Sequence, residues 1–184
     1  AKMGPMKERV QKLNKGFGEV KVSDATVGLF IGGGRGIKYM LWDCSALDPI
    51  EGIRFRGFSI PELREKLPKA PGGTEPLPEA IFYLLLLGEI PTYEDCLAIT
   101  EEWRKRSALP DYLLKTMNAV PADTHPMTQF SLAILQLQKN SVFARRYREG
   151  MPKSEYWDAM FEDTMDILAK LPHIAAYIYR RMYR

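Results

Sequence analysis

Cysteine and histidine are scarce in this sequence, which has two of each among its 184 residues. Cys44 and Cys96 cannot build a disulfide framework, and their spacing is not that of metal ligands. His125 and His173 are too few to complete a His/Cys metal cluster. The longest uninterrupted apolar run, Ala80–Leu87, is far shorter than the roughly 20 residues needed to cross a bilayer. We therefore expect no metal site and no membrane span.

An excess of charge of one sign is also nearly absent, because 26 Lys and Arg oppose 23 Asp and Glu, which gives +3. Dedicated nucleic-acid-binding domains carry a concentrated basic excess, so we expect no nucleic-acid partner. The basic run Arg145–Arg148 is compatible with an anion-binding face, although a solvated helix face is the commoner explanation. The opening residues contain no apolar signal segment, so a targeting peptide is either absent or already removed. The composition, 46% hydrophobic and 27% charged, is that of a globular protein or of part of one.

Glycine and proline divide the chain into a strand-containing first part, residues 1–58, and a helical second part, residues 59–184. Within the first part, three short runs alternate in polarity or are rich in β-branched residues, which is typical of strands: Glu19–Ile31, Ile37–Trp42 and Ile53–Gly57. A glycine-rich turn separates the first two runs. We expect a small β-hairpin or ribbon near residues 19–57 in a mainly α fold.

Capping signals predict where the helices begin and end. Ser59 has the character of an N-cap, because proline and an acidic residue follow it within one turn. Pro78–Leu87 is apolar on nearly every face, which is typical of a helix inside a core, and Gly88 is placed to stop it. Further helices are expected at residues 5–15, from Thr92 to Ser107, from Asp111 to Val120, from Pro126 to Asn140 with Asp123 or Thr124 as its cap, at residues 141–149, and from Met151-Pro152 onward.

The last of these helices is unusually long. Acidic residues lie early in it and basic residues late, which complements the helix dipole, and Pro172 is expected to kink it. A helix of roughly 30 residues is about 45 Å long. A compact domain of this size cannot cover that length alone, so the helix needs a partner, either more chain or another subunit.

Among candidate binding residues, Gly32–Gly36 contains Arg35, and such a loop can bring backbone N–H groups and a guanidinium to a phosphate. The run matches neither the dinucleotide-binding nor the P-loop motif, and a plain tight turn is the simpler interpretation. Lys153, near the start of the last helix, is a second possible phosphate partner, although a surface lysine is the commoner case.

Candidate catalytic residues are few. His125 lies at a helix start and His173 beside an apolar run, and structural roles fit both better than catalysis. Asp158 and Glu162 are spaced as a carboxylate pair, but an acidic first turn explains them more simply. The residues alone therefore give a weak catalytic signal.

Several segments together resemble the N-terminal part of eukaryotic mitochondrial-type citrate synthase, in register from about Gly32 to Arg184. They are Leu47-Asp48-Pro49, Glu51-Gly52-Ile53-Arg54-Phe55-Arg56-Gly57-Phe58-Ser59-Ile60-Pro61, Leu67-Pro68-Lys69-Ala70, Glu75-Pro76-Leu77-Pro78-Glu79, Gly88-Glu89-Ile90-Pro91-Thr92, His125-Pro126-Met127 and Ala169-Lys170-Leu171-Pro172.

The resemblance implies the large helical domain of an enzyme that condenses acetyl-CoA with oxaloacetate to give citrate and CoA in the tricarboxylic acid cycle. In this family one histidine stabilises the enol of acetyl-CoA, an aspartate removes the methyl proton and a second histidine polarises the oxaloacetate carbonyl. These residues lie in motifs of the type P-L-H-G, G-Y-G-H and N-V-D. None of the three motifs occurs here, so we expect no catalytic residue in this chain, no small catalytic domain, and no activity from these 184 residues alone.

The resemblance also assigns binding residues and partners. Arg35 occupies the place of an arginine that contacts CoA phosphate. Lys153 occupies the place of a second such arginine, and a lysine there keeps the positive charge but cannot bind phosphate with two parallel hydrogen bonds. The helices at about 126–140 and 152–184 match helices that build the family's homodimer interface. A mitochondrial matrix location and no permanently bound cofactor are further expectations. As an alternative, the chain is a truncated homologue that serves as a non-catalytic structural subunit of a larger mitochondrial assembly.

Overall fold

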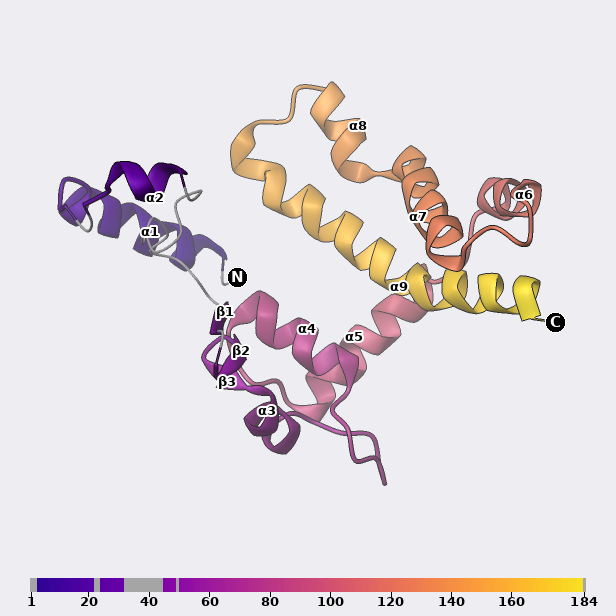
Figure 1. Cartoon of the computed structure of the whole chain (residues 1–184), viewed down its shortest axis with the longest axis horizontal. Coiled ribbons are helices and arrows are strands. Elements are labelled where there is room, and N and C mark those ends of the chain that lie inside the picture. Colours follow the sequence, from indigo (N-terminus) through magenta and orange to yellow (C-terminus); the bar gives the residue numbers. More distant parts are fainter. Residues whose placement is uncertain (1–2, 22–23, 32–44, 49, 184) are drawn as a thin grey trace. The chain divides into compact units, whose positions relative to one another are not determined.

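The computed structural model describes residues 3–21, 24–31, 45–48 and 50–183. The chain forms two compact units, Ala1–Cys96 and Leu97–Arg184. Helices predominate in both units, and the strands that the structure describes all lie in the first (Figure 1). The expected mainly α fold with a small sheet is confirmed.

The first unit contains an antiparallel sheet of three short strands in the order β1-β2-β3. Strand β1 pairs with β2 so that Ser45 lies opposite Phe55 and Asp48 opposite Gly52. The elements of this unit are α1 (Met3–Phe17), α2 (Val27–Ile31), β1 (Ser45–Asp48), β2 (Gly52–Phe55), β3 (Phe58–Ser59), α3 (Ile60–Lys66), α4 (Pro78–Leu87) and the start of α5 (Tyr93–Arg106).

The prediction of a strand in the first run of the expected ribbon is wrong. The run Glu19–Ile31 ends in the short helix α2, not in a strand. Val27 and Ile31 are exposed, whereas the strand preference of β-branched residues comes from packing on a half-buried pleated surface. The expected strand at Ile37–Trp42 and the glycine-rich turn before it lie outside the described residues.

The turn between β2 and β3 holds an unusual backbone conformation. Arg56 has φ 52° and Gly57 has φ 88°, and two positive φ angles in succession are what a type I′ hairpin turn requires. The left-handed conformation costs a residue with a side chain about 1–2 kcal/mol. The Arg56 guanidinium donates to the carbonyl of Leu85 from Nε at 3.0 Å and also from Nη2. This carbonyl belongs to the last turn of α4, which has no basic residue of its own, so Arg56 supplies the positive charge that a helix C-terminus favours.

The expected boundaries of α3 and α4 are confirmed. At the start of α3, the Ser59 N–H donates to the Glu62 carboxylate at 2.7 Å and the Glu62 N–H donates to the Ser59 hydroxyl at 3.4 Å. This reciprocal pair is a capping box. At the end of α4, Gly88 adopts φ 77°, and its N–H donates to the carbonyl of Leu84 at 2.8 Å.

The capping box predicts a pH-dependent contribution to stability. The Ser59 backbone N–H, and then its hydroxyl, hold the pKa of Glu62 below the ordinary value. A carboxyl whose folded pKa lies below its unfolded pKa stabilises the fold above the unfolded value, and this contribution is lost as the pH falls through the folded value. We expect Glu62→Gln to lower the melting temperature at pH 7 and to lose this effect at about pH 3. Thermal unfolding, followed by circular dichroism between these two pH values, measures the difference in melting temperature between the parent protein and the variant.

Glu65→Gln is the matched control for this prediction, because Glu65 is exposed on the same helix. An equal pH dependence of both variants would contradict the proposed role of the capping box.

The core of the first unit lies on one face of α3 and α4. Leu84 and Cys96 have no exposed surface, and burial is the main cause that raises the pKa of the Cys96 thiol, which keeps it protonated and unreactive. Leu85 and Leu86 remain 39% and 37% exposed. The expectation that α4 is buried on nearly every face is therefore met on one side only. The buried cluster consists of Leu63, Leu67, Ala80, Leu84 and Cys96.

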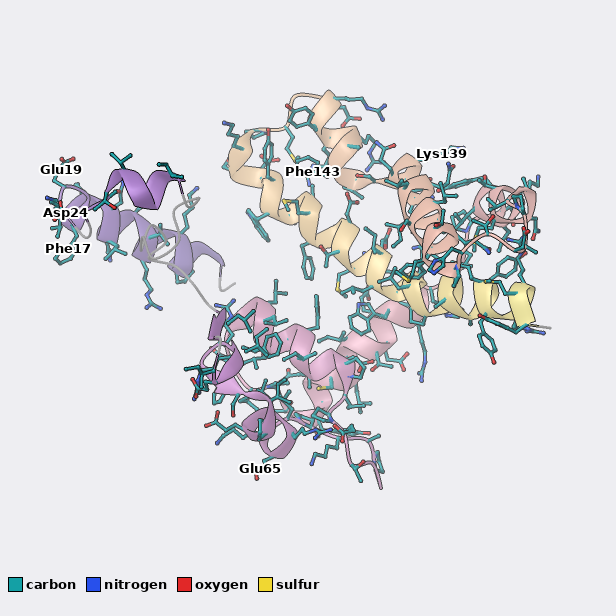
Figure 2. All side chains as sticks on the ribbon, in the orientation of Figure 1. Phe17, Glu19, Asp24, Glu65, Lys139 and Phe143 are labelled. Carbon is teal, nitrogen blue, oxygen red and sulfur yellow. The ribbon has the colours of Figure 1, made fainter. Side chains whose placement is uncertain are left out.

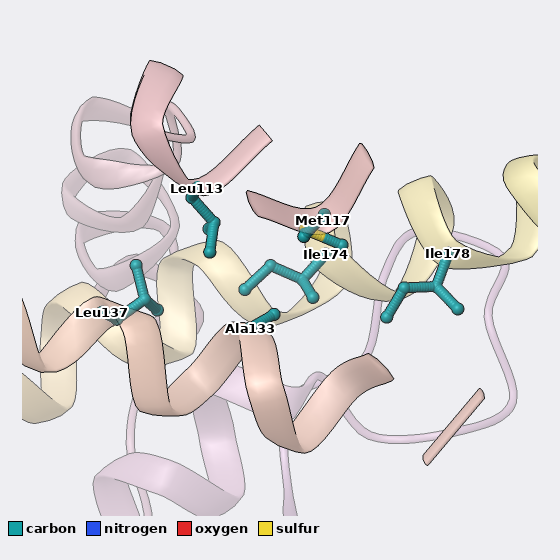
Figure 3. Packing of buried hydrophobic residues seen from close by; sticks show 6 residues of the cluster. All are labelled: Leu113, Met117, Ala133, Leu137, Ile174 and Ile178. Atoms are coloured by element: carbon teal, nitrogen blue, oxygen red, sulfur yellow. The ribbon is translucent and has the colours of Figure 1, made fainter. Parts of the chain in front are cut away.

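The second unit packs three helices around one core. Its elements are the remainder of α5, α6 (Asp111–Ala119), α7 (Pro126–Leu137), the 3-10 turn η1 (Gln138–Asn140), α8 (Val142–Arg148), the 3-10 turn η2 (Lys153–Glu155) and α9 (Tyr156–Tyr183). Helices α6, α7 and α9 each contribute two buried residues spaced four apart, which places both on one helix face. Figure 3 shows the six: Leu113, Met117, Ala133, Leu137, Ile174 and Ile178.

Helix α9 continues on both sides of Pro172. Proline has no N–H, so the carbonyl of Leu168, four residues earlier, lacks the donor that an α-helix normally provides. The long terminal helix expected from the sequence is confirmed as 28 residues.

Candidate functional site

The two expected CoA contacts differ in what the structure shows of them. Arg35 lies outside the described residues. Lys153 lies in η2, directly before α9, and its side chain is exposed. An exposed ammonium at this position is accessible to an anionic ligand, although it offers a point charge in place of the two-pronged contact of an arginine.

The surroundings of Lys153 are organised by an ion network. Arg146 of α8 donates to Glu155 at 2.8 Å and to Asp158 at 2.7 Å. The hydrogen bond with Asp158 is the main cause that raises the pKa of Arg146. Since two carboxylates neutralise the middle of the run Arg145–Arg148, the run does not act as a single anion-binding face. Its first and last arginines are exposed, as expected for a solvated helix face.

The carboxylates Asp158 and Glu162 do not form a catalytic pair. Asp158 accepts from Arg146, whereas Glu162 accepts from Arg106 at 2.7 Å. Arg106 also donates to Glu102 at 2.8 Å, and its hydrogen bond with Glu162 is the largest cause that raises the pKa of Arg106. Each carboxylate therefore holds α9 to another helix of the unit, which is a structural role.

The structure gives His125 a structural role and leaves His173 exposed. His125 is the N-cap of α7, and its Nδ1 accepts from the Met127 N–H at 3.2 Å. The cap expected at Asp123 or Thr124 is therefore wrong: Pro126 is the first residue of α7, so the N-cap is the residue directly before it. His173 lies on an exposed face of α9.

Two polar networks that the sequence does not predict join distant segments of the second unit. Arg181 of α9 donates to the carbonyls of Met117 at 2.5 Å and Val120 at 2.7 Å and to the Gln129 side chain at 3.1 Å. The buried Gln129 amide in turn donates to the carbonyl of Thr124 at 2.7 Å. We call this the Arg181 clasp, because it fixes the segment between α6 and α7.

The second network caps α8 from α9. The Asp163 carboxylate accepts from the Ser141 hydroxyl at 2.6 Å and from the N–H groups of Val142 at 2.7 Å and Phe143 at 3.2 Å. A carboxylate at a helix N-terminus satisfies unpaired N–H groups and complements the dipole. The sequence offers no local signal for it, because Asp163 lies about twenty residues from its partners.

Helices α7 and α9 expose a large apolar surface. The exposed fractions are 70% for Leu135, 57% for Met160 and 59% for Tyr179. A groove of about 480 Å³ lies between the start of α7 and the end of α9, and its lining is almost entirely apolar. Exposed apolar side chains beside an apolar groove are typical of a surface that packs against a partner or against further chain.

A smaller cavity of about 240 Å³ lies between the end of α7 and the middle of α9. Its charged lining residues already bind one another or their neighbours: Asp163 caps α8, Asp166 accepts from Arg106 and Lys170 donates to the Asp166 carbonyl. The cavity therefore offers apolar contact more than polar recognition.

Within the described residues, no cluster of three or more histidine, cysteine or carboxylate side chains is placed to hold a metal ion. The helices that the structure describes include none that combines the length and apolarity needed to cross a membrane.

Comparison with known proteins identifies the family. A family model described as citrate synthase, C-terminal domain, matches residues 32–184. The mitochondrial citrate synthases of Xiphias gladius and Kajikia audax are each 49% identical over 176 residues, which is 96% of this chain and 38% of each relative. That of Aspergillus niger is 49% identical over 177 residues, 96% of this chain and 37% of the relative. The chain thus spans less than two fifths of the length of these relatives.

The fold is similar to that of a solved citrate synthase. The crystal structure of citrate synthase from Pyrobaculum aerophilum matches 91% of this chain and 36% of its own chain, with a TM-score of 0.60 and 20% sequence identity. At this identity the match bears on the fold alone. Because the family model covers most of the chain, the protein belongs to the citrate synthase family.

Proposed function

We propose that this chain is the N-terminal section of a mitochondrial citrate synthase, and that the complete protein condenses acetyl-CoA with oxaloacetate to give citrate and CoA. The observation that supports this most strongly is 49% identity to mitochondrial citrate synthases over 96% of the chain. General acid–base catalysis needs its acid and base within hydrogen-bond reach of the substrate. The catalytic histidines and aspartate come from motifs absent from this sequence, so the 184 residues alone are inactive.

The experiment isolates the native protein from its source with antibodies raised against this chain. Thiol release is measured with acetyl-CoA in the presence and in the absence of oxaloacetate, beside the purified 184-residue chain. We expect oxaloacetate-dependent release by the native protein and none by the chain alone. A native protein without turnover would overturn the enzymatic proposal in favour of a non-catalytic structural subunit. Turnover by the chain alone would show that its catalytic residues lie elsewhere than proposed.

Arg35 and Lys153 are the proposed contacts to the CoA phosphates, by position in the family resemblance. Support for Lys153 is its exposure at the start of α9. In the native enzyme we expect Lys153→Glu to raise the KM for acetyl-CoA by at least about tenfold and to leave the KM for oxaloacetate unchanged, because loss of a charge-assisted contact costs about 1.5–3 kcal/mol. Lys139→Glu, on η1, is the matched charge control, and an equal effect of both variants contradicts a specific contact.

The complete enzyme is further proposed to be a homodimer held by α7 and α9. The exposed side chains of Leu135, Met160 and Tyr179 support this, as does the apolar groove between these helices. Analytical ultracentrifugation of the native enzyme tests it. We expect a dimer, and conversion to monomer when Met160 is replaced by Glu. A monomeric parent protein, or a Met160→Glu protein that stays dimeric, contradicts the assignment of the interface.

A further inference from the structure

Helix α1 carries an apolar stripe that the proposed function does not use. Val10, Leu13 and Phe17 follow one another at spacings of three and four, and Met3 and Met6 extend the same spacing in the sequence. A helix turns by about 100° per residue, so these positions share one narrow face. Val10, Leu13 and Phe17 are 45%, 40% and 64% exposed. Figure 2 labels Phe17 at the C-terminal end of α1.

The positive charge of the chain is concentrated on the same helix. Helix α1 contains four basic residues and one acidic residue, which gives +3, and the net charge of the whole chain is also +3. The charges of all residues outside α1 therefore sum to zero. The charged residues of α1 are Lys7, Glu8, Arg9, Lys12 and Lys15.

The positions of the basic residues relative to the stripe point to one kind of partner. Lys7 and Arg9 project about 80° to either side of the stripe, and Lys12 and Lys15 lie on the opposite face, by helix geometry. A narrow apolar face with basic residues beside it and low overall hydrophobicity is typical of helices that lie in the plane of a membrane interface. The stripe extends over only about two heptads, which is too short for a coiled coil.

We propose that α1 is a membrane-surface helix that binds bilayers containing anionic lipids. The apolar stripe enters the boundary between headgroups and acyl chains, and Lys7 and Arg9 beside it contact lipid phosphates, while Lys12 and Lys15 on the opposite face add to the attraction of the anionic surface. Each basic residue near an anionic surface strengthens such binding, and salt weakens it. An acidic protein would need an apolar groove beside its charges to match both features, whereas an anionic bilayer presents the two together. The inference goes beyond the proposed enzyme activity and does not depend on it.

The test is sedimentation of the full chain with lipid vesicles at low and at high salt. One set of vesicles contains equal parts of phosphatidylcholine and phosphatidylglycerol, and the other contains phosphatidylcholine alone. A charge variant combines Lys7→Glu with Arg9→Glu, which flank the stripe, and an apolar variant combines Leu13→Ser with Phe17→Ser. The control combines Arg145→Glu with Arg148→Glu, which changes the net charge equally at the exposed run on α8. Circular dichroism verifies the fold of each variant.

We expect the parent protein to bind the anionic vesicles and not the neutral ones, and high salt to release it. Both α1 variants should bind at least about tenfold more weakly, whereas the control should stay within about twofold of the parent. Equal loss in the control would assign binding to bulk charge and overturn the proposal. The absence of vesicle binding together with a lower melting temperature of Leu13→Ser/Phe17→Ser would also overturn it, because α1 would then pack against protein. Binding of polyglutamate without binding of vesicles would likewise overturn the proposal, because α1 would then recognise an acidic polypeptide and not a bilayer.

Discussion

Replacement of Ile174 by alanine is expected to lower the free energy of unfolding by about 2–5 kcal/mol, which is the range for truncating a fully buried aliphatic side chain. Ile174 has no exposed surface and lies between α6 and α7 in the core of the second unit (Figure 3). The cost has two parts, the lost transfer free energy of the removed methyl and methylene groups and the cavity left among its neighbours. Urea unfolding of the parent and the variant measures the difference.

Leu135→Ala is the matched control for this experiment, because it also shortens an aliphatic side chain in a helix but at a position that is 70% exposed. We expect a change within about 0.5 kcal/mol for the isolated chain. If Ile174→Ala costs no more than Leu135→Ala, the packing of α9 against α6 and α7 is not the main source of stability in this unit.

The second large effect is expected from the Arg181 clasp. Arg181→Met keeps the aliphatic stem but removes every donor, so the carbonyls of Met117 and Val120 and the Gln129 side chain each lose a partner. Hydrogen bonds to charged groups contribute about 1.5–3 kcal/mol, and a buried acceptor without a donor adds to the cost. We expect the unfolding free energy to fall by about 2–4 kcal/mol, and amide hydrogen exchange to increase in the segment between α6 and α7.

Arg180→Met provides the comparison, since Arg180 is the preceding residue of the same helix and is exposed. The two variants change the net charge equally. A similar loss of stability in both would show that the charge of the helix end matters and that the clasp does not.

Local signals in the sequence predict the helices well. The Ser59 cap, the Gly88 stop and the apolar face of α9 each act within one or two turns, so they can be read from neighbouring residues. The prediction is wrong for one run whose residues lack the half-buried sheet surface that a strand preference depends on. The β-branched run before Ile31 suggests a strand, yet it ends in the helix α2.

Tertiary contacts could not be predicted in this way. Arg181 meets its three acceptors across 52 to 64 residues of sequence, and Arg56 reaches the end of α4 across 29. A lone arginine carries no information about which distant carbonyl it will bind. For the candidate site, resemblance to the family was more informative than residue chemistry. The role of Lys153 stays a prediction, and Arg35 lies outside the described residues.

The positions of the core residues along the chain affect the order of folding during synthesis. The buried cluster of the first unit is complete in sequence once Cys96 has been added. The second unit draws two of the six residues of its buried core cluster, Ile174 and Ile178, from the end of α9. Helices α6 and α7 therefore leave the ribosome before their apolar partner exists, and they must wait roughly 40 residues, or several seconds of translation, with their apolar faces exposed. During this interval the exposed apolar faces are open to aggregation and to chaperone binding.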